Sequence, residues 1–114
     1  PHYTTRIPTY KVVNIPHLAI NTSTGTGADC TAFAIINDSE WRYKLILVVP
    51  GVAPSVGISD PLFMRLQPNH LVAWTGMDAL VHAIEPCIGR LNFPVALATG
   101  LRAIKLIAEN LREA

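Results

Sequence analysis

Asp78 and His82 are the residues of this chain whose types and spacing are best suited to chemistry. They are four positions apart, and residues four apart in an α-helix project from one face, one turn above the other. A carboxylate oxygen beside an imidazole nitrogen can supply two ligands to one divalent ion. This mixed pair suits Fe, Zn, Mn or Co better than Ca. The spacing therefore makes Asp78 and His82 candidate metal ligands.

The same residues also fit interpretations without a metal. Thr75 and Asp78 have the spacing of a capping box, with Asp78 as the third residue of a helix. An ordinary hydrogen bond between Asp78 and His82 is another alternative. Glu85 follows His82 by three positions and could be a third ligand, although a bond to a backbone amide or an arginine explains it more simply. The apolar neighbours on almost every side predict that this helix is buried.

A loop rich in glycine and hydroxyl residues is the second informative stretch. It covers residues 21–29 and follows a short apolar run, residues 17–20, that predicts a buried strand. Backbone amides freed by Gly25 and Gly27, together with the Thr and Ser hydroxyls, can form a nest for an anionic oxygen or a cofactor amide. The loop lacks the GxGxxG spacing and the lysine of a Walker loop. From the residues alone, a plain glycine-rich turn is the better interpretation, and a nest for a ligand is the alternative.

The first half of the chain is predicted to be rich in strands. The proline- and threonine-rich residues 1–16 indicate a connecting segment. Strands over residues 31–36 and 42–49, joined by a turn at 37–40, predict a β-hairpin. One further short strand is expected within residues 53–61.

The second half is predicted to be helical. Pro68 opens a helical region that Gly76 interrupts, and the helix carrying the candidate ligands then continues to about Glu85, where Pro86 and Gly89 end it. Pro94 begins a last helix with Lys105 and Glu109 paired on its wet side. Its apolar stripe indicates a helix of a bundle, since two heptads are too few for a coiled coil; the stripe consists of Leu97, Leu101, Ile104, Ala108 and Leu111.

Composition limits the classes of partner. The 114 residues carry a net charge of +1, half are apolar and only 15% are charged, below the usual quarter. No apolar run is long enough for a transmembrane helix, and no basic block favours nucleic acid or an anionic membrane. Cys30 and Cys87, without a CxxC motif, indicate two reduced, buried thiols of an intracellular protein, expected in the cytoplasm. The mean hydropathy of +0.33 favours a piece of a larger protein whose apolar faces meet absent partners.

Two separated stretches together resemble the iron-containing (group III) alcohol dehydrogenases: residues 22–29, Thr-Ser-Thr-Gly-Thr-Gly-Ala-Asp, and residues 76–85, Gly-Met-Asp-Ala-Leu-Val-His-Ala-Ile-Glu. Residues 56–61 match a short strand of that family that ends in Asp-Pro. The resemblance implies that residues 1–66 are the C-terminal portion of an α/β nucleotide-binding domain. Residues 67–114 would be the first helices of an all-helical metal-binding domain, and the chain a central fragment.

The family resemblance also implies a cofactor set. Asp78 and His82 match the first two of four metal ligands, and two histidines beyond Ala114 would complete the site. Thr22 and Thr26 match residues that contact the cofactor, and Leu71 a position near the nicotinamide. We expect Fe²⁺, with Zn²⁺ as the alternative, and NAD or NADP as cofactors. The expected partners are an alcohol or aldehyde substrate, the remainder of the same enzyme, and further copies of it in a homo-oligomer.

Some positions depart from the family pattern and leave the substrate and the choice of cofactor open. Asp29 stands where the family usually has Glu, and Ala28 stands where it usually has Ser. Asn21 stands where Pro is usual, and Pro86 stands where a small residue is more typical. A zinc polyol dehydrogenase, a dehydroquinate-synthase-like enzyme of the same fold, and an inactive truncated module are the alternative functions. With two of four ligands, residues 1–114 alone are expected to bind metal weakly and to oxidise no alcohol.

Overall fold

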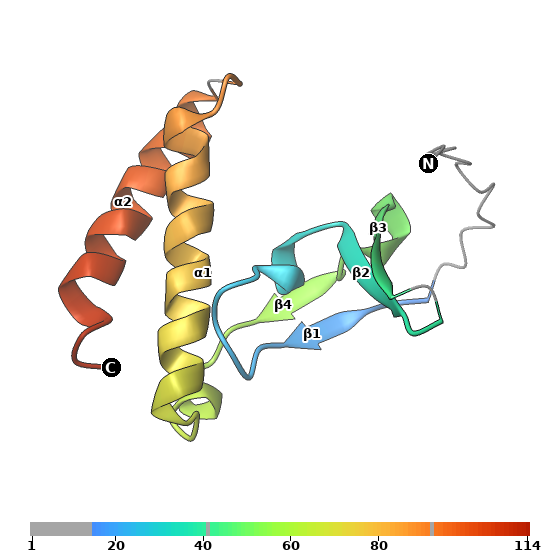
Figure 1. Ribbon diagram of the computed structural model, residues 1–114, viewed down its shortest axis with the longest axis horizontal. Coiled ribbons are helices and arrows are strands. Elements are labelled where there is room, and N and C mark those ends of the chain that lie inside the picture. The colour runs from blue at the N-terminus through green and yellow to red at the C-terminus, as the bar shows by residue number, and fades with distance from the viewer. Residues whose placement is uncertain (1–14, 41, 92) are drawn as a thin grey trace.

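The computed structural model describes residues 15–40, 42–91 and 93–114 (Figure 1). Most of the connecting segment predicted over residues 1–16 lies outside this range. The strands are β1 (Leu18–Ile20), β2 (Phe33–Asp38), β3 (Tyr43–Val48) and β4 (Val56–Ile58). The helices are α1 (Asn69–Ile88) and α2 (Pro94–Asn110), and short 3-10 turns cover Ala28–Cys30, Pro50–Val52 and Pro61–Met64. The predicted order of strands followed by helices is confirmed.

The parallel pair of β1 and β4 positions the loop that follows β1. Leu18 lies opposite Val56, and Ile20 lies opposite Ile58. Because the strands are parallel, the loop after Ile20 and the residues after Ile58 leave the sheet at the same edge. In open α/β sheets, ligands bind outside this carboxyl edge.

The predicted hairpin is formed by β2 and β3, which pair antiparallel with Phe33 opposite Val48 and Asp38 opposite Tyr43. The Asp38 carboxylate accepts a hydrogen bond from the Glu40 backbone N–H at 3.0 Å, as is typical of an Asx turn. Local side-chain chemistry therefore closes the hairpin where the sequence indicated.

Helix α1 is continuous, so the interruption predicted at Gly76 and the end predicted at Pro86 are wrong. Gly76 is buried, and a Cβ there would collide with the Leu111 side chain. It thus provides room for the end of α2 instead of breaking α1. Pro86 lies in the last turn, where its missing N–H leaves only the His82 carbonyl without its helical donor. The helix ends two residues after Pro86, at Ile88, and the predicted end at Gly89 is confirmed, because the Gly89 N–H donates to the Glu85 carbonyl at 2.8 Å and caps the helix.

Helices α1 and α2 pack side by side through small residues (Figure 1). Ala83 is 6% exposed, and a Cβ added to the buried Gly100 would lie 2.7 Å from the Ala83 carbonyl oxygen. The stripe predicted on α2 is only partly correct, because Leu101 is 56% exposed while Leu111 contacts α1. The side of α2 that carries Gly100 faces α1, because glycine lets the two backbones approach closely. Leu101, on another side of α2, is left exposed.

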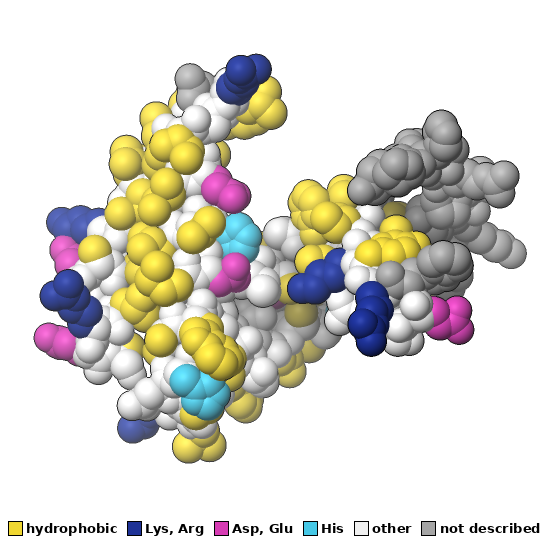
Figure 2. Space-filling model, viewed as in Figure 1, with side chains coloured by type: hydrophobic (Ala, Val, Ile, Leu, Met, Phe, Trp, Pro, Cys, Tyr) yellow, Lys and Arg dark blue, Asp and Glu magenta, His cyan; other side chains and the backbone are white. Residues whose placement is uncertain are grey.

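The described part of the chain buries little apolar surface. Ala83 is buried at 6% exposure, whereas many large hydrophobic side chains of the described part are exposed and cover much of the visible surface (Figure 2). The radius of gyration is 16.5 Å, whereas a compact domain of this length would have about 13 Å. The predicted burial of α1 is therefore wrong for this chain: Trp74, Met77 and Val81 are exposed. No described helix is long and apolar enough to cross a membrane.

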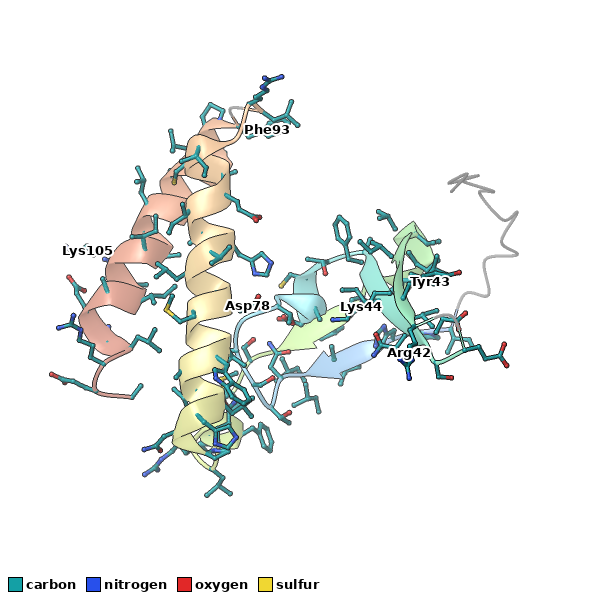
Figure 3. The ribbon with its side chains drawn as sticks, viewed as in Figure 1. Arg42, Tyr43, Lys44, Asp78, Phe93 and Lys105 are labelled. Atoms are coloured by element: carbon teal, nitrogen blue, oxygen red, sulfur yellow. The ribbon has the colours of Figure 1, made fainter. Side chains whose placement is uncertain are left out.

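The remaining predictions concern side chains at the surface. Lys105 and Glu109 form the predicted ion pair at 3.7 Å, and Figure 3 shows Lys105 on α2. Both side chains are exposed, so the pair adds little to stability. Cys30 and Cys87 are both free thiols, but the prediction that both are buried is wrong, since Cys30 is exposed and Cys87 half-buried.

Candidate metal and cofactor site

Asp78 and His82 lie in the middle of α1, and Figure 3 shows Asp78 on the side that faces the strands. Asp78 Oδ2 is 3.7 Å from His82 Nδ1, and the two side chains are 45% and 52% exposed. The two side chains therefore lie on one face of α1. Because Nδ1 lies 3.3 Å from the Gly25 carbonyl oxygen and can only donate to it, Nε2 is the ring nitrogen that is left to bind an ion. The donor set therefore fits half of a four-ligand divalent metal site.

The structure does not support the alternative interpretations of Asp78, His82 and Glu85. The capping box is wrong, because Thr75 lies inside α1 and its hydroxyl donates to the Leu71 carbonyl at 2.9 Å. The separation of Asp78 and His82 is also too long for a hydrogen bond. Glu85 does not join them: among the described residues, no three His, Cys, Asp or Glu side chains form a group that could hold a metal.

The glycine-rich loop is seated on the same face of α1. Gly25 has φ +121°, and a Cβ added to it would lie 2.7 Å from the Thr75 carbonyl oxygen and 3.0 Å from Asp78 Oδ2. Its own carbonyl oxygen is 3.3 Å from His82 Nδ1. A carbonyl only accepts, so Nδ1 is the donor in this contact. The two stretches that the sequence singled out separately therefore meet at one place.

Two further contacts hold the loop against the helical part. The hydroxyls of Thr24 and Thr75 are 3.3 Å apart. The Gln67 side-chain amide donates to the Thr22 carbonyl at 2.6 Å. The loop is thus fixed to the helical part at both Thr22 and Thr24.

A pocket of about 320 Å³ opens beside the loop at the carboxyl edge of β1 and β4. Asn21, Thr26, Asp29 and Ser59 are among the polar residues that line it. The Asn21 amide donates to the Ser59 hydroxyl at 3.0 Å and so ties the ends of the two strands together. Ser59 is a site residue that was not predicted, although its place directly after a strand is a usable signal.

Asp29 carries the negative charge of this pocket. A hydrogen bond from the Asn21 side chain, and then one from the Cys30 thiol, hold the pKa of the Asp29 carboxyl below its ordinary value. The thiol lies 3.4 Å from Asp29 Oδ2. The same hydrogen bond and the charge of the carboxylate raise the pKa of the Cys30 thiol. Asp29 is therefore ionised at neutral pH, while Cys30 is kept protonated.

The predicted cofactor residues lie at different distances from this pocket. Thr26 lines it, and its hydroxyl accepts a long hydrogen bond of 3.4 Å from the Ala28 N–H. Thr22 is exposed on the loop but outside the pocket lining, and Leu71 is half-buried in the first turn of α1, also outside the lining. The contacts of these three residues with a cofactor stay predictions.

The arrangement of strands and helices is that of one part of an alcohol dehydrogenase fold. A crystal structure of a 1,3-propanediol oxidoreductase matches 87% of this chain and 26% of its own, with a TM-score of 0.81 and 43% identity. An iron-containing alcohol dehydrogenase from Thermotoga maritima matches 87% of this chain and 27% of its own, with a TM-score of 0.79 and 31% identity.

Sequence comparison gives the same class. The chain is 43% identical over 99 residues to a 1,3-propanediol dehydrogenase of Klebsiella pneumoniae, covering 87% of the chain and 26% of that protein. It is 40% identical over 115 residues to an NAD-dependent methanol dehydrogenase of Bacillus methanolicus, covering 96% and 30%. No protein-family model matches the chain. The chain is a homologue of the iron-containing (group III) alcohol dehydrogenases, and it spans about a quarter of the length of the relatives it matches first.

Proposed function

We propose that this chain is part of a metal-dependent, NAD(P)-linked dehydrogenase that interconverts alcohols and aldehydes by hydride transfer. The observation that carries the proposal is the seating of Gly25 on the face of α1 that presents Asp78 and His82. This contact joins the candidate cofactor loop to the candidate metal ligands. Relatives named as alcohol dehydrogenases, one of them NAD-dependent, support the reaction class.

Asp78 and His82 would hold the ion, with Fe²⁺ as the first expectation and Zn²⁺ as the alternative. The Asp78 carboxylate contributes negative charge, and the Gly25 carbonyl restrains the His82 ring through Nδ1. When bound, the ion would polarise the alcohol oxygen and favour its alkoxide near neutral pH. Two further histidines beyond Ala114 would complete the ligand set.

The loop would bind the dinucleotide. The hydroxyls of Thr22 and Thr26 and the backbone amides around Gly25 and Gly27 are suited to phosphate and carboxamide oxygens. Leu71 would pack near the nicotinamide. Because the loop is fixed to α1 through Thr24 and Thr75, it would hold the cofactor at a set distance from the metal ligands. Such positioning is the protein's main contribution to a hydride transfer carried out by a cofactor.

The domain division belongs to the same proposal. Residues 1–66 would be the end of the nucleotide-binding domain, and residues 67–114 the start of the helical domain, so the site would lie between them. The remainder of the enzyme, a second copy of it, and an alcohol or aldehyde are the expected partners.

An Asp78→Asn substitution in the full-length gene product tests the proposal. Asn keeps the shape and has a similar helix propensity, but it lacks the charge that attracts a dication. We expect loss of bound iron and zinc by elemental analysis and loss of NAD⁺ reduction with a primary alcohol. The thermal midpoints of the metal-free proteins should agree. Glu85→Gln, an exposed carboxylate on the same helix outside the pair, is the matched control and should keep both properties. Full metal occupancy with normal turnover in Asp78→Asn would remove the site assignment.

A further inference from the structure

The hydrogen bond between Thr24 and Thr75 has a direction that the structure determines. The Thr75 hydroxyl has one proton, and its shortest contact is with the Leu71 carbonyl at 2.9 Å. The Thr24 hydroxyl lies farther away, at 3.3 Å. The Thr75 proton therefore goes to the Leu71 carbonyl, and Thr75 Oγ1 accepts the proton of Thr24. This bond joins residues 51 positions apart, so it belongs to the tertiary structure.

The residues on either side of this bond belong to the two candidate binding sites. On α1, Thr75, Asp78 and His82 follow a spacing of three and then four, which places them on one face. On the loop, Thr24 precedes Gly25, whose carbonyl oxygen lies 3.3 Å from His82 Nδ1 and where an added Cβ would lie 3.0 Å from Asp78 Oδ2. Thr24 also lines both the 320 Å³ pocket and a larger, mainly apolar pocket of about 780 Å³ between the helices. A shift of the loop therefore moves the surroundings of the candidate metal ligands directly.

We infer that Thr24 and Thr75 are positioning residues that make the metal ion and the dinucleotide bind cooperatively; this inference rests on the proposed function. An ion on Asp78 and His82 fixes the face on which the loop is seated. A dinucleotide on the loop fixes the carbonyl that restrains His82. Each ligand thus orders residues that the other ligand would otherwise have to order, so the second ligand binds at a smaller cost in conformational entropy. Such coupling is necessarily reciprocal.

The test is a pair of binding titrations on the full-length gene product. The affinity for NAD⁺ is measured with metal-free and with Zn²⁺-saturated protein, and the affinity for Zn²⁺ with and without NAD⁺. In the wild type, each ligand should raise the affinity for the other by about fivefold or more. Thr75→Val and Thr24→Val should each lower this coupling factor at least about twofold, toward a factor of one, as expected for the loss of one hydroxyl hydrogen bond. The double variant should lose no more than either single variant, because both remove the same bond.

Thr99→Val is the matched control. Thr99 also donates to the carbonyl four residues earlier at 2.9 Å, but it lies exposed on α2 and no contact with the loop is present in the described part of the chain. It should keep the full coupling. Equal coupling in the wild type, Thr24→Val and Thr75→Val would overturn the inference, as would independent binding of the two ligands to the wild type. If instead the wild type binds neither Zn²⁺ nor NAD⁺, or Asp78→Asn still binds Zn²⁺ normally, the proposed function itself fails.

Discussion

The backbone carbonyl of Gly25 lies 3.3 Å from Nδ1 of His82, across 57 positions of sequence. The contact depends on a missing side chain, because a Cβ on Gly25 would come within 2.7 Å of the Thr75 carbonyl oxygen. A glycine of the loop is therefore as much a part of the candidate site as the two candidate ligands.

Gly25→Ala and Gly27→Ala separate this contact from ordinary backbone strain. Both glycines have positive φ, but nothing lies within 4 Å of a Cβ at Gly27. Gly27→Ala should cost only the conformational term, about 1–2 kcal/mol of the free energy of unfolding. Gly25→Ala should in addition displace the loop and lower the affinity for both metal and NAD⁺ in the full-length protein. Calorimetric binding measurements on both variants check this, and equal affinities in the two would contradict it.

Thr26→Val should weaken dinucleotide binding without changing metal content. The substitution keeps the shape and removes a hydroxyl that lines the pocket, so cofactor oxygens or amides there would lose a partner at a cost of about 1–3 kcal/mol. Titration of NAD⁺ by fluorescence measures the loss, and elemental analysis checks the metal. Thr99→Val, which is far from the pocket, should leave both values unchanged. An unaltered NAD⁺ affinity in Thr26→Val would take the loop out of the cofactor site.

The packing of α1 against α2 should tolerate a methyl group at Gly76 better than one at Gly100. A Cβ at Gly76 meets the end of the Leu111 side chain, which can rotate away, whereas a Cβ at Gly100 meets the Ala83 backbone carbonyl at 2.7 Å. Alanine gains about 1 kcal/mol of helix propensity at either position. At Gly76 this gain should offset much of the clash, while overpacking at Gly100 costs about 1–3 kcal/mol. The thermal unfolding midpoint of Gly100→Ala should therefore be lower than that of Gly76→Ala. The reverse order would show that the helices separate easily.

Removal of the Asp29 charge should make Cys30 more reactive. The hydrogen bond to Asp29 and its negative charge raise the pKa of the thiol, so Asp29→Asn should bring that pKa down. A lower pKa gives more thiolate at pH 8, and the thiolate is the reactive form. Alkylation of Cys30 by iodoacetamide, followed by peptide mapping, should be faster in Asp29→Asn than in the wild type. The half-buried Cys87 provides an internal reference whose rate should not change; an equal rate at Cys30 in both proteins would argue against the contact with Asp29.

Local patterns predicted those elements whose signals are local. The hairpin follows from β-branched residues around a turn cluster, and the start of α2 from Pro94. Gly76 and Pro86 were misleading as signals of helix ends. Gly76 lies inside α1 because packing against Leu111 outweighs the low helix propensity of glycine, and Pro86 is tolerated because it lies in the last turn. The pairing of Asp78 with His82 follows from helical spacing alone. The position of Gly25 against them could not be predicted from spacing, since it is a tertiary contact between residues 57 positions apart.

The hairpin has a consequence for handling the chain on its own. Within the described residues, β2 and β3 pair only with each other, so each has an outer edge of backbone groups that no described strand covers. Phe33, Ile35 and Ile46 are at least half exposed along them. Six-residue strands with free edges and apolar side chains are templates for further strands from other molecules. Expressed on its own, this chain should therefore self-associate through the hairpin, and a lysine at Ile35 or Ile46 is the simplest means of keeping it dispersed.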